Sequence, residues 1–137
     1  MRILLVQDST GHSTGYHVVA RGLRDAGLEV ILGGALIPRQ IAQLAGEEAP
    51  DAIGYRIMDA APAILVERLV AELRRLELAD IPVVVGGIVA DEDRRRLAGL
   101  GVAGVFEPGA TLESIADFFR GLARTAPAAA ALAESGR

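Results

Sequence analysis

One histidine in this sequence occupies a position where its side chain could do chemistry. His12 lies in a loop bracketed by glycines, and the loop follows an apolar run at Ile3–Val6. If that run is the first strand of an open parallel sheet, the loop lies at the strand's carboxyl end, where such folds bind ligands. An exposed imidazole there can ligate a metal or transfer a proton. A solvated loop histidine without a role is the competing interpretation.

Composition narrows the classes of function. The chain has 137 residues, of which 51% are hydrophobic and only 4% aromatic, as an aliphatic core of buried parallel strands requires. It has no cysteine, which excludes disulfides, thiolate metal sites and a cysteine nucleophile. All 14 basic residues are arginines, which excludes Schiff-base and other lysine chemistry. A net charge of −4 without a basic face argues against nucleic acid as a partner.

Short apolar runs alternate with helical patterns along the chain. The expected strands are Arg2–Val6, Glu29–Leu32, Ala52–Tyr55, Pro82–Val85 and Gly101–Phe106. The expected helices are Gly15–Ala26, Pro38–Glu48, Ala61–Leu76, Asp91–Leu97 and Leu112–Ala123, with Gly27 and Gly99 ending the first and the fourth. Strict alternation predicts a flavodoxin-like α/β fold, a five-stranded parallel sheet with helices on both faces. We expect one domain over residues 1–124 and an Ala-rich tail over residues 125–137.

The loops that follow the strands should converge on one edge of such a sheet. They are Gln7–Gly15, Gly33–Ile37, Arg56–Ala60, Gly86–Ala90 and Glu107–Thr111. His12, Arg56 and the pairs Gly86-Gly87 and Pro108-Gly109 are therefore expected on a common rim. The absence of an N-terminal leader and of an apolar run of about 18 residues predicts a cytoplasmic protein without a membrane span.

Three familiar α/β sites do not fit these residues. A phosphoacceptor receiver domain needs acidic residues such as Asp8 and Asp59, but also a lysine after the fifth strand, where this chain has Glu107. Gly11 and Gly15 do not have the spacing of a dinucleotide-binding fingerprint. The sequence has no Gly-x-Ser-x-Gly elbow of a serine hydrolase.

From about Arg2 to Ala123 the sequence resembles the cobalamin-binding domains of acyl-CoA mutases, in particular the small subunits and C-terminal domains of the methylmalonyl-CoA type. The resemblance rests on four segments in the family's order. They are His12-Ser13-Thr14-Gly15, the helix that follows it at Val18–Gly27, Pro82–Ile88 with its glycine pair, and Gly101–Gly109.

The resemblance implies that His12 is the lower ligand of a cobalt corrinoid bound base-off, with the nucleotide tail in a groove between the sheet and a helix. The implied cofactor is adenosylcobalamin, and the implied partner is a separate catalytic chain that binds an acyl-CoA thioester. No catalytic residue is expected in this chain, and self-association is left open. The implied cofactor-binding residues are Thr10, Gly11, His12, Gly15, Arg56, Met58, Gly86, Gly87, Phe106, Pro108 and Gly109.

The sequence departs from the family pattern at three positions. The family's aspartate before the histidine is Thr10, its lysine at the end of the first strand is Gln7, and its Ser-x-Leu reads Arg56-Ile57-Met58. Arg56 could cross the groove paired with Asp59, point outward to water, or bind a phosphate; the last two are favoured. The alternative function is a diverged domain that has lost the corrinoid and serves in interaction or regulation, or binds another small anion. A methyl-transfer corrinoid protein is a third, weaker interpretation.

Overall fold

The structure, a computed structural model that describes residues 1–11 and 13–122, is built on one parallel sheet of five strands in the order β2-β1-β3-β4-β5. The strands are β1 (Arg2–Gln7), β2 (Glu29–Ala35), β3 (Ala52–Arg56), β4 (Val83–Gly86) and β5 (Gly104–Phe106). All four neighbouring pairs are parallel. This strand order is that of flavodoxin-like folds, so the predicted fold class is confirmed.

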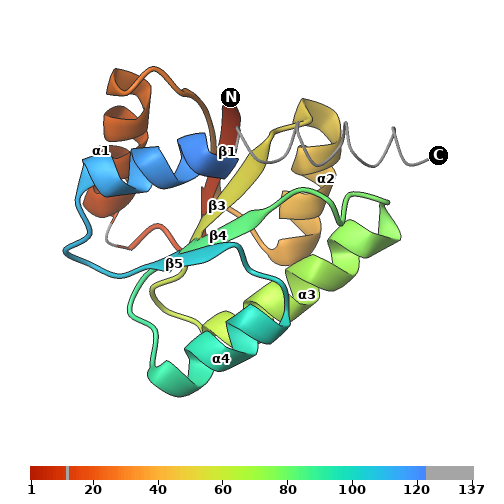
Figure 1. The fold of residues 1–137 in the computed structure, drawn as a ribbon. Coiled ribbons are helices and arrows are strands. Elements are labelled where there is room, and N and C mark those ends of the chain that lie inside the picture. Colours follow the sequence, from red (N-terminus) through yellow and green to blue (C-terminus); the bar gives the residue numbers. More distant parts are fainter. Residues whose placement is uncertain (12, 123–137) are drawn as a thin grey trace.

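Helices cover both faces of the sheet (Figure 1). The helices are α1 (Ser13–Asp25), α2 (Pro38–Glu48), α3 (Pro62–Arg75), α4 (Asp91–Gly99) and a helix that begins at residue 112 and is described as far as residue 122, here called the 112–122 helix. One face carries α1 and the 112–122 helix, and the other carries α2, α3 and α4. The expected tail, residues 125–137, lies outside the described residues. Within the described part, no helix is both long and apolar enough to cross a membrane.

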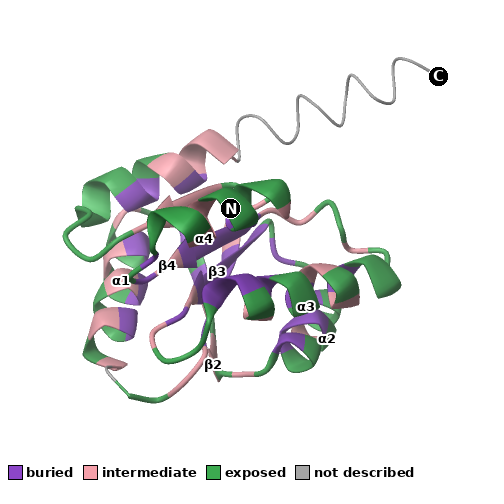
Figure 2. Ribbon diagram, turned by 90° about the horizontal axis from the view of Figure 1, so that it is seen from below, coloured by how far each residue is buried: buried purple, intermediate pink, exposed green. Residues whose placement is uncertain are grey.

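The two faces of the sheet bury two separate apolar cores (Figure 2). The core under α2, α3 and α4 includes Ile41, Tyr55, Val66, Leu69, Val85 and Leu97. The core under α1 and the 112–122 helix includes Ile3, Leu5, Tyr16, Leu23, Val84 and Phe119. Because successive strand residues point to opposite faces, β3 gives Tyr55 to the first core and turns Gly54 and Arg56 toward the second.

Two strand ends differ from the sequence-based expectation by more than one residue. We expected Gly33–Ile37 to be a loop, but β2 continues to Ala35, with a register shift against β1 after Leu5. We expected a strand from Gly101, but β5 begins at Gly104. Residues 101 and 102 instead complete the end of α4: Val102 N–H donates to Leu97 O at 3.1 Å, and Gly101 adopts φ +88°. The helix ends at Gly99 as expected, and the glycine with a left-handed backbone that follows it is Gly101.

The hydroxyl of Tyr16 joins α1 to the sheet at the register shift. It donates to Leu5 O at 2.7 Å and accepts from Gly34 N–H at 3.0 Å. Tyr16 is 2% exposed, and burial raises the pKa of its phenol. The hydroxyl therefore satisfies one backbone group on each of β1 and β2, at the point where their pairing is irregular.

We expect Tyr16→Phe to lower the free energy of unfolding by about 1–3 kcal/mol, because Leu5 O and Gly34 N–H lose a buried partner. Tyr55→Phe is the matched control, since the Tyr55 hydroxyl is buried and has no hydrogen-bond partner among the described residues. The control should be as stable as the wild type, or more stable. Chemical denaturation of the three proteins checks this, and equal destabilisation by both substitutions would contradict it.

Candidate functional site

The carboxyl ends of β1 and β3 form the point at which the sheet reverses its direction of winding. From β1 the chain passes through α1 to β2 at one edge, and then through α2 to β3 on the other side of β1. The segments that leave β1 and β3 at this point therefore diverge to opposite faces of the sheet. In open α/β sheets, ligands bind in the crevice at such a point.

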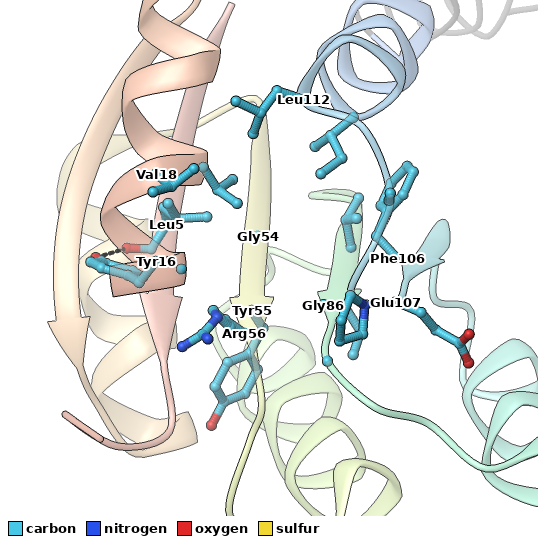
Figure 3. Close-up of a pocket in the computed structure, with 18 of the residues that line it drawn as sticks. Leu5, Tyr16, Val18, Gly54, Tyr55, Arg56, Gly86, Phe106, Glu107 and Leu112 are labelled. Carbon is cyan, nitrogen blue, oxygen red and sulfur yellow. Dashed lines mark hydrogen bonds between the residues drawn. The ribbon is translucent and has the colours of Figure 1, made fainter. Parts of the chain in front are cut away.

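A cavity of about 340 Å³ opens at this edge, on the face covered by α1 and the 112–122 helix. Figure 3 shows it between α1 on one side and the segment from Phe106 to Leu112 on the other, with β3 and β4 beneath. Most of its wall is apolar, and includes Leu5, Val18, Val84, Phe106, Leu112 and Ile115. The volume lies in the range of about 300–1,000 Å³ that is typical of small-molecule sites.

Glycines create the floor of this cavity. A Cβ on Gly54 would lie 2.9 Å from Leu5 Cδ1, whereas a Cβ on Gly86 would meet nothing nearer than Phe106 O at 3.8 Å. A side chain at position 86 would thus occupy free space in the cavity. Gly87 adopts φ +142°, and a Cβ there would lie 2.2 Å from Ile57 O. The turn after β4 therefore requires glycine at position 87.

Asp8 fixes the end of β1 to the loop that follows β3. Its Oδ1 accepts from Met58 N–H at 3.0 Å, and its Oδ2 accepts from Asp59 N–H at 2.8 Å and Ala60 N–H at 2.9 Å. Its own N–H donates to Arg56 O at 3.0 Å. Hydrogen bonds to a charged acceptor are stronger than those between neutral groups. Asp8 therefore holds both sides of the crevice in a fixed relation.

Arg56 spans the mouth of the cavity. Figure 3 shows its side chain turning from the end of β3 toward α1. A Cβ on Gly15 would lie 2.7 Å from Arg56 Nη2, so the guanidinium lies directly against the backbone of the first turn of α1. Its Nη1 is buried without a hydrogen-bond partner among the residues described. The expected alternatives of an ion pair with Asp59 and of an outward orientation are both wrong.

The carboxylates near the cavity have other partners or other positions. Glu107 points away from the cavity in Figure 3, and its Oε1 lies 2.6 Å from Arg94 Nη2. Asp8 binds the backbone of the loop after β3. The Asp59 carboxylate lies 3.8 Å from the position of a Cβ on Gly11, beside the loop between β1 and α1. Asp59 is therefore near Arg56 in sequence, but its carboxylate faces a different loop.

The end of β1 carries a second buried polar side chain. Gln7 is 4% exposed and lies directly opposite Arg56 in the register of β1 and β3. Its Nε2 donates to Ser13 Oγ at 3.5 Å, and its Oε1 has no partner in residues 1–11 and 13–122. Ser13 Oγ in turn donates to Thr10 O. These contacts tie the beginning of α1 to the end of β1.

Most of the residues predicted for the site do meet in this cavity. Its walls include Gly15, Arg56, Met58, Gly86, Gly87, Phe106, Pro108 and Gly109. Thr10 and Gly11 are exposed in the loop before α1 and do not line it. His12, the predicted metal ligand, lies outside the described residues. Among residues 1–11 and 13–122, no group of three or more His, Asp or Glu side chains is placed to hold a metal ion.

Sequence reasoning missed the apolar residues that line the cavity, and it missed Asp8 and Tyr16, whose hydrogen bonds hold the surrounding segments in place. Leu5, Gly54 and Phe119 line the cavity, but each looks like an ordinary core residue in the sequence. The alternation of β3 could have identified Gly54, because it places this glycine on the same face as Arg56. Nothing in the sequence indicated the roles of Asp8 and Tyr16, because both bind backbone atoms of distant residues.

Comparison with known proteins gives a family match over most of the chain. The model of the B12 binding domain matches residues 3–116. The chain is 41% identical over 109 residues to the pivalyl-CoA mutase small subunit of Xanthobacter autotrophicus, covering 78% of this chain and 72% of that protein. It is 37% identical over 99 residues to ethylmalonyl-CoA mutase of Cereibacter sphaeroides, covering 72% of this chain but only 15% of that protein.

A solved structure supports the same fold. A cobalamin-binding protein from Desulfitobacterium hafniense superposes with a TM-score of 0.73 at 17% identity, covering 88% of this chain and 58% of that one. At this level of identity the likeness concerns the fold alone.

We expect Asp8→Ala to lower the free energy of unfolding by about 1.5–3 kcal/mol, because three backbone N–H groups lose a charged acceptor. Asp59→Ala is the matched control, since this neighbouring acid is exposed and its side chain makes no hydrogen bond or ion pair within the described residues. The control should change stability by less than about 0.5 kcal/mol. Urea denaturation checks both, and an equal effect of the two substitutions would contradict the role given to Asp8.

Proposed function

Because this chain belongs to the B12-binding domain family, we propose that it is the cobalamin-binding subunit of an adenosylcobalamin-dependent acyl-CoA mutase. The observation that carries this proposal is the glycine-floored apolar cavity between the sheet and α1. It opens at the carboxyl ends of β1 and β3, directly beside the loop whose sequence contains His12. A cavity of this kind suits a flat aromatic group that is connected to a larger body outside.

The residues present fit such a cofactor. The missing side chain at Gly86 leaves a slot over the sheet, and Leu5, Phe106 and Phe119 give it apolar walls for an aromatic base. At its mouth, Arg56 presents a buried nitrogen with no acceptor in the described part of the chain. A long polar tail with an apolar end would thus meet apolar walls inside and hydrogen-bonding capacity at the entrance.

In this proposal each part of the chain has a binding role. His12 would hold the cobalt, and the loop of Thr10 and Gly11 would present it. Gly15, Gly86 and Gly87 allow the nucleotide tail to lie against backbone, while Met58, Phe106, Pro108 and Gly109 enclose it. Adenosylcobalamin, when bound, supplies carbon radicals through its cobalt–carbon bond, and the protein supplies ligation and orientation.

Turnover requires a second chain or domain that binds the acyl-CoA substrate. The charged groups in the cavity wall are Arg56 and Glu107, and Glu107 is paired with Arg94 outside it. Neither is placed as a general base or a nucleophile. A likeness that covers 72% of a small subunit but 15% of ethylmalonyl-CoA mutase supports a partner that supplies the catalytic part.

The alternative function is a diverged domain that binds no corrinoid. The position of Arg56 across the mouth is the observation that favours it, since the side chain would have to move before a tail could enter. Titration of the purified chain with hydroxocobalamin, followed by its visible spectrum, decides between the two. Absence of any spectral change at cobalamin concentrations well above those of the protein would favour the alternative.

The first prediction for this function concerns the metal ligand. With bound cob(II)alamin, the electron paramagnetic resonance spectrum should show hyperfine splitting from one axial nitrogen, and His12→Ala should abolish it. Labelling the protein with nitrogen-15 should change the splitting, because the ligand then comes from the protein. His17→Ala is the matched control, as this second histidine lies in α1 and should leave the spectrum unchanged. Splitting that survives His12→Ala would show that the ligand is wrongly assigned.

The second prediction concerns the floor of the cavity. Gly86→Val should weaken cobalamin binding at least about 10-fold, because the new side chain fills the slot, while a Cβ there meets only an ordinary contact at 3.8 Å. Gly46→Ala in α2 is the control, since its Cβ meets Leu78 at 3.6 Å on the opposite face of the sheet. Binding is measured by absorbance titration, and folding by the melting temperature. Full affinity in a folded Gly86→Val protein would place the tail elsewhere.

A further inference from the structure

We propose that Arg56 binds the phosphodiester of the corrinoid's nucleotide tail and thereby selects complete cobalamin over corrinoids that lack the nucleotide. This inference rests on the proposed function and assigns one residue of its site a part in specificity. The guanidinium leaves the end of β3 and lies against Gly15 at the start of α1, so any tail that enters the cavity passes it.

The guanidinium has no counter-charge among the residues described. Within the described part of the chain, no ion pair joins it to a carboxylate within 4.0 Å, and Nη1 is buried without an acceptor. The acids that flank the crevice are engaged or turned away: Asp8 binds three backbone N–H groups, and Glu107 pairs with Arg94. An unpaired, partly buried cation is unfavourable unless a ligand supplies its partner.

The surroundings of Arg56 favour a phosphate as that partner. A guanidinium presents a planar fork of N–H donors that matches two phosphate oxygens, and such charge-assisted pairs are stronger than neutral hydrogen bonds. The first turn of α1, a helix of 13 residues, begins beside it and adds a favourable field for an anion. The apolar slot behind Arg56 suits an aromatic base. A ligand that has both a base and a phosphate is a nucleotide.

The closeness to Gly15 makes this arrangement specific to glycine at the start of α1. A Cβ at position 15 would lie 2.7 Å from Nη2 and 3.2 Å from Cζ, so a larger residue would displace the guanidinium. The absence of a side chain at Gly15 on α1 therefore makes room for the guanidinium of Arg56 from β3.

The test compares two corrinoids on two proteins. Cobalamin carries the nucleotide and its phosphodiester, whereas cobinamide lacks both and keeps the corrin ring. Arg56→Gln should weaken cobalamin binding roughly 10- to 100-fold, the range for loss of a charged hydrogen-bonding partner, and leave cobinamide binding unchanged. Arg56→Lys should fall between, because it keeps the charge but loses the fork. Arg68→Gln, an exposed arginine of α3 on the opposite face, is the matched control and should change neither affinity.

Each outcome of these titrations supports or overturns the assignment. Cobalamin affinity that is unchanged or increased in Arg56→Gln would show that the arginine blocks the cavity and does not bind the phosphate. Equal weakening of both corrinoids would show that it shapes the site without meeting the phosphate. Adenosine monophosphate that binds the free chain with the same dependence on Arg56 would make the ligand a free nucleotide. If the folded wild type binds neither corrinoid, the proposed function itself fails.

Discussion

The carboxylate of Asp8 is the constraint on which the rest of the crevice depends. Parallel strands end at one edge of a sheet, but nothing in the sheet itself fixes the loops that leave them. Here one side chain at the end of β1 accepts three backbone N–H groups from the loop after β3, which lies 50 residues further along the chain. The position of Met58, and the direction in which Arg56 leaves β3, follow from this fixed loop.

Tyr16 supplies a second anchor at the same edge of the sheet, on the side of α1. Its hydroxyl holds α1 against β1 and β2 where their register shifts. The hydrogen bonds of both anchors go to backbone atoms and do not depend on a ligand. The end of β1, the loop after β3 and the start of α1 are therefore held in place before any cofactor binds, which lowers the entropic cost of binding.

The sequence allowed the fold and about half of the site to be predicted, for physical reasons that differ between residues. Apolar runs and helix periodicity identified all five strands, because these signals are local, whereas Gly15, Gly86 and Gly87 were assigned to the site from the family resemblance. The end of β2 was misplaced because a tyrosine hydroxyl from α1 holds the backbone at Gly34. The less favoured alternative, an Arg56–Asp59 pair, is wrong because residues close in sequence need not be close in space: Asp59 faces Gly11, and Arg56 faces Gly15.

The departures from the family pattern at Gln7 and Arg56 are related, because the two residues are neighbours in the sheet. The resemblance puts a lysine at Gln7 and a serine at Arg56, and these positions are direct register partners on β1 and β3. Compared with the family pattern, the positive charge therefore lies at the same register position but on β3 instead of β1. With the cation on β3, Gln7 becomes a neutral buried group that contacts Ser13, and the positive charge moves to the cavity mouth. The two departures therefore compensate each other in charge, which supports the proposed binding site over a diverged domain without a ligand.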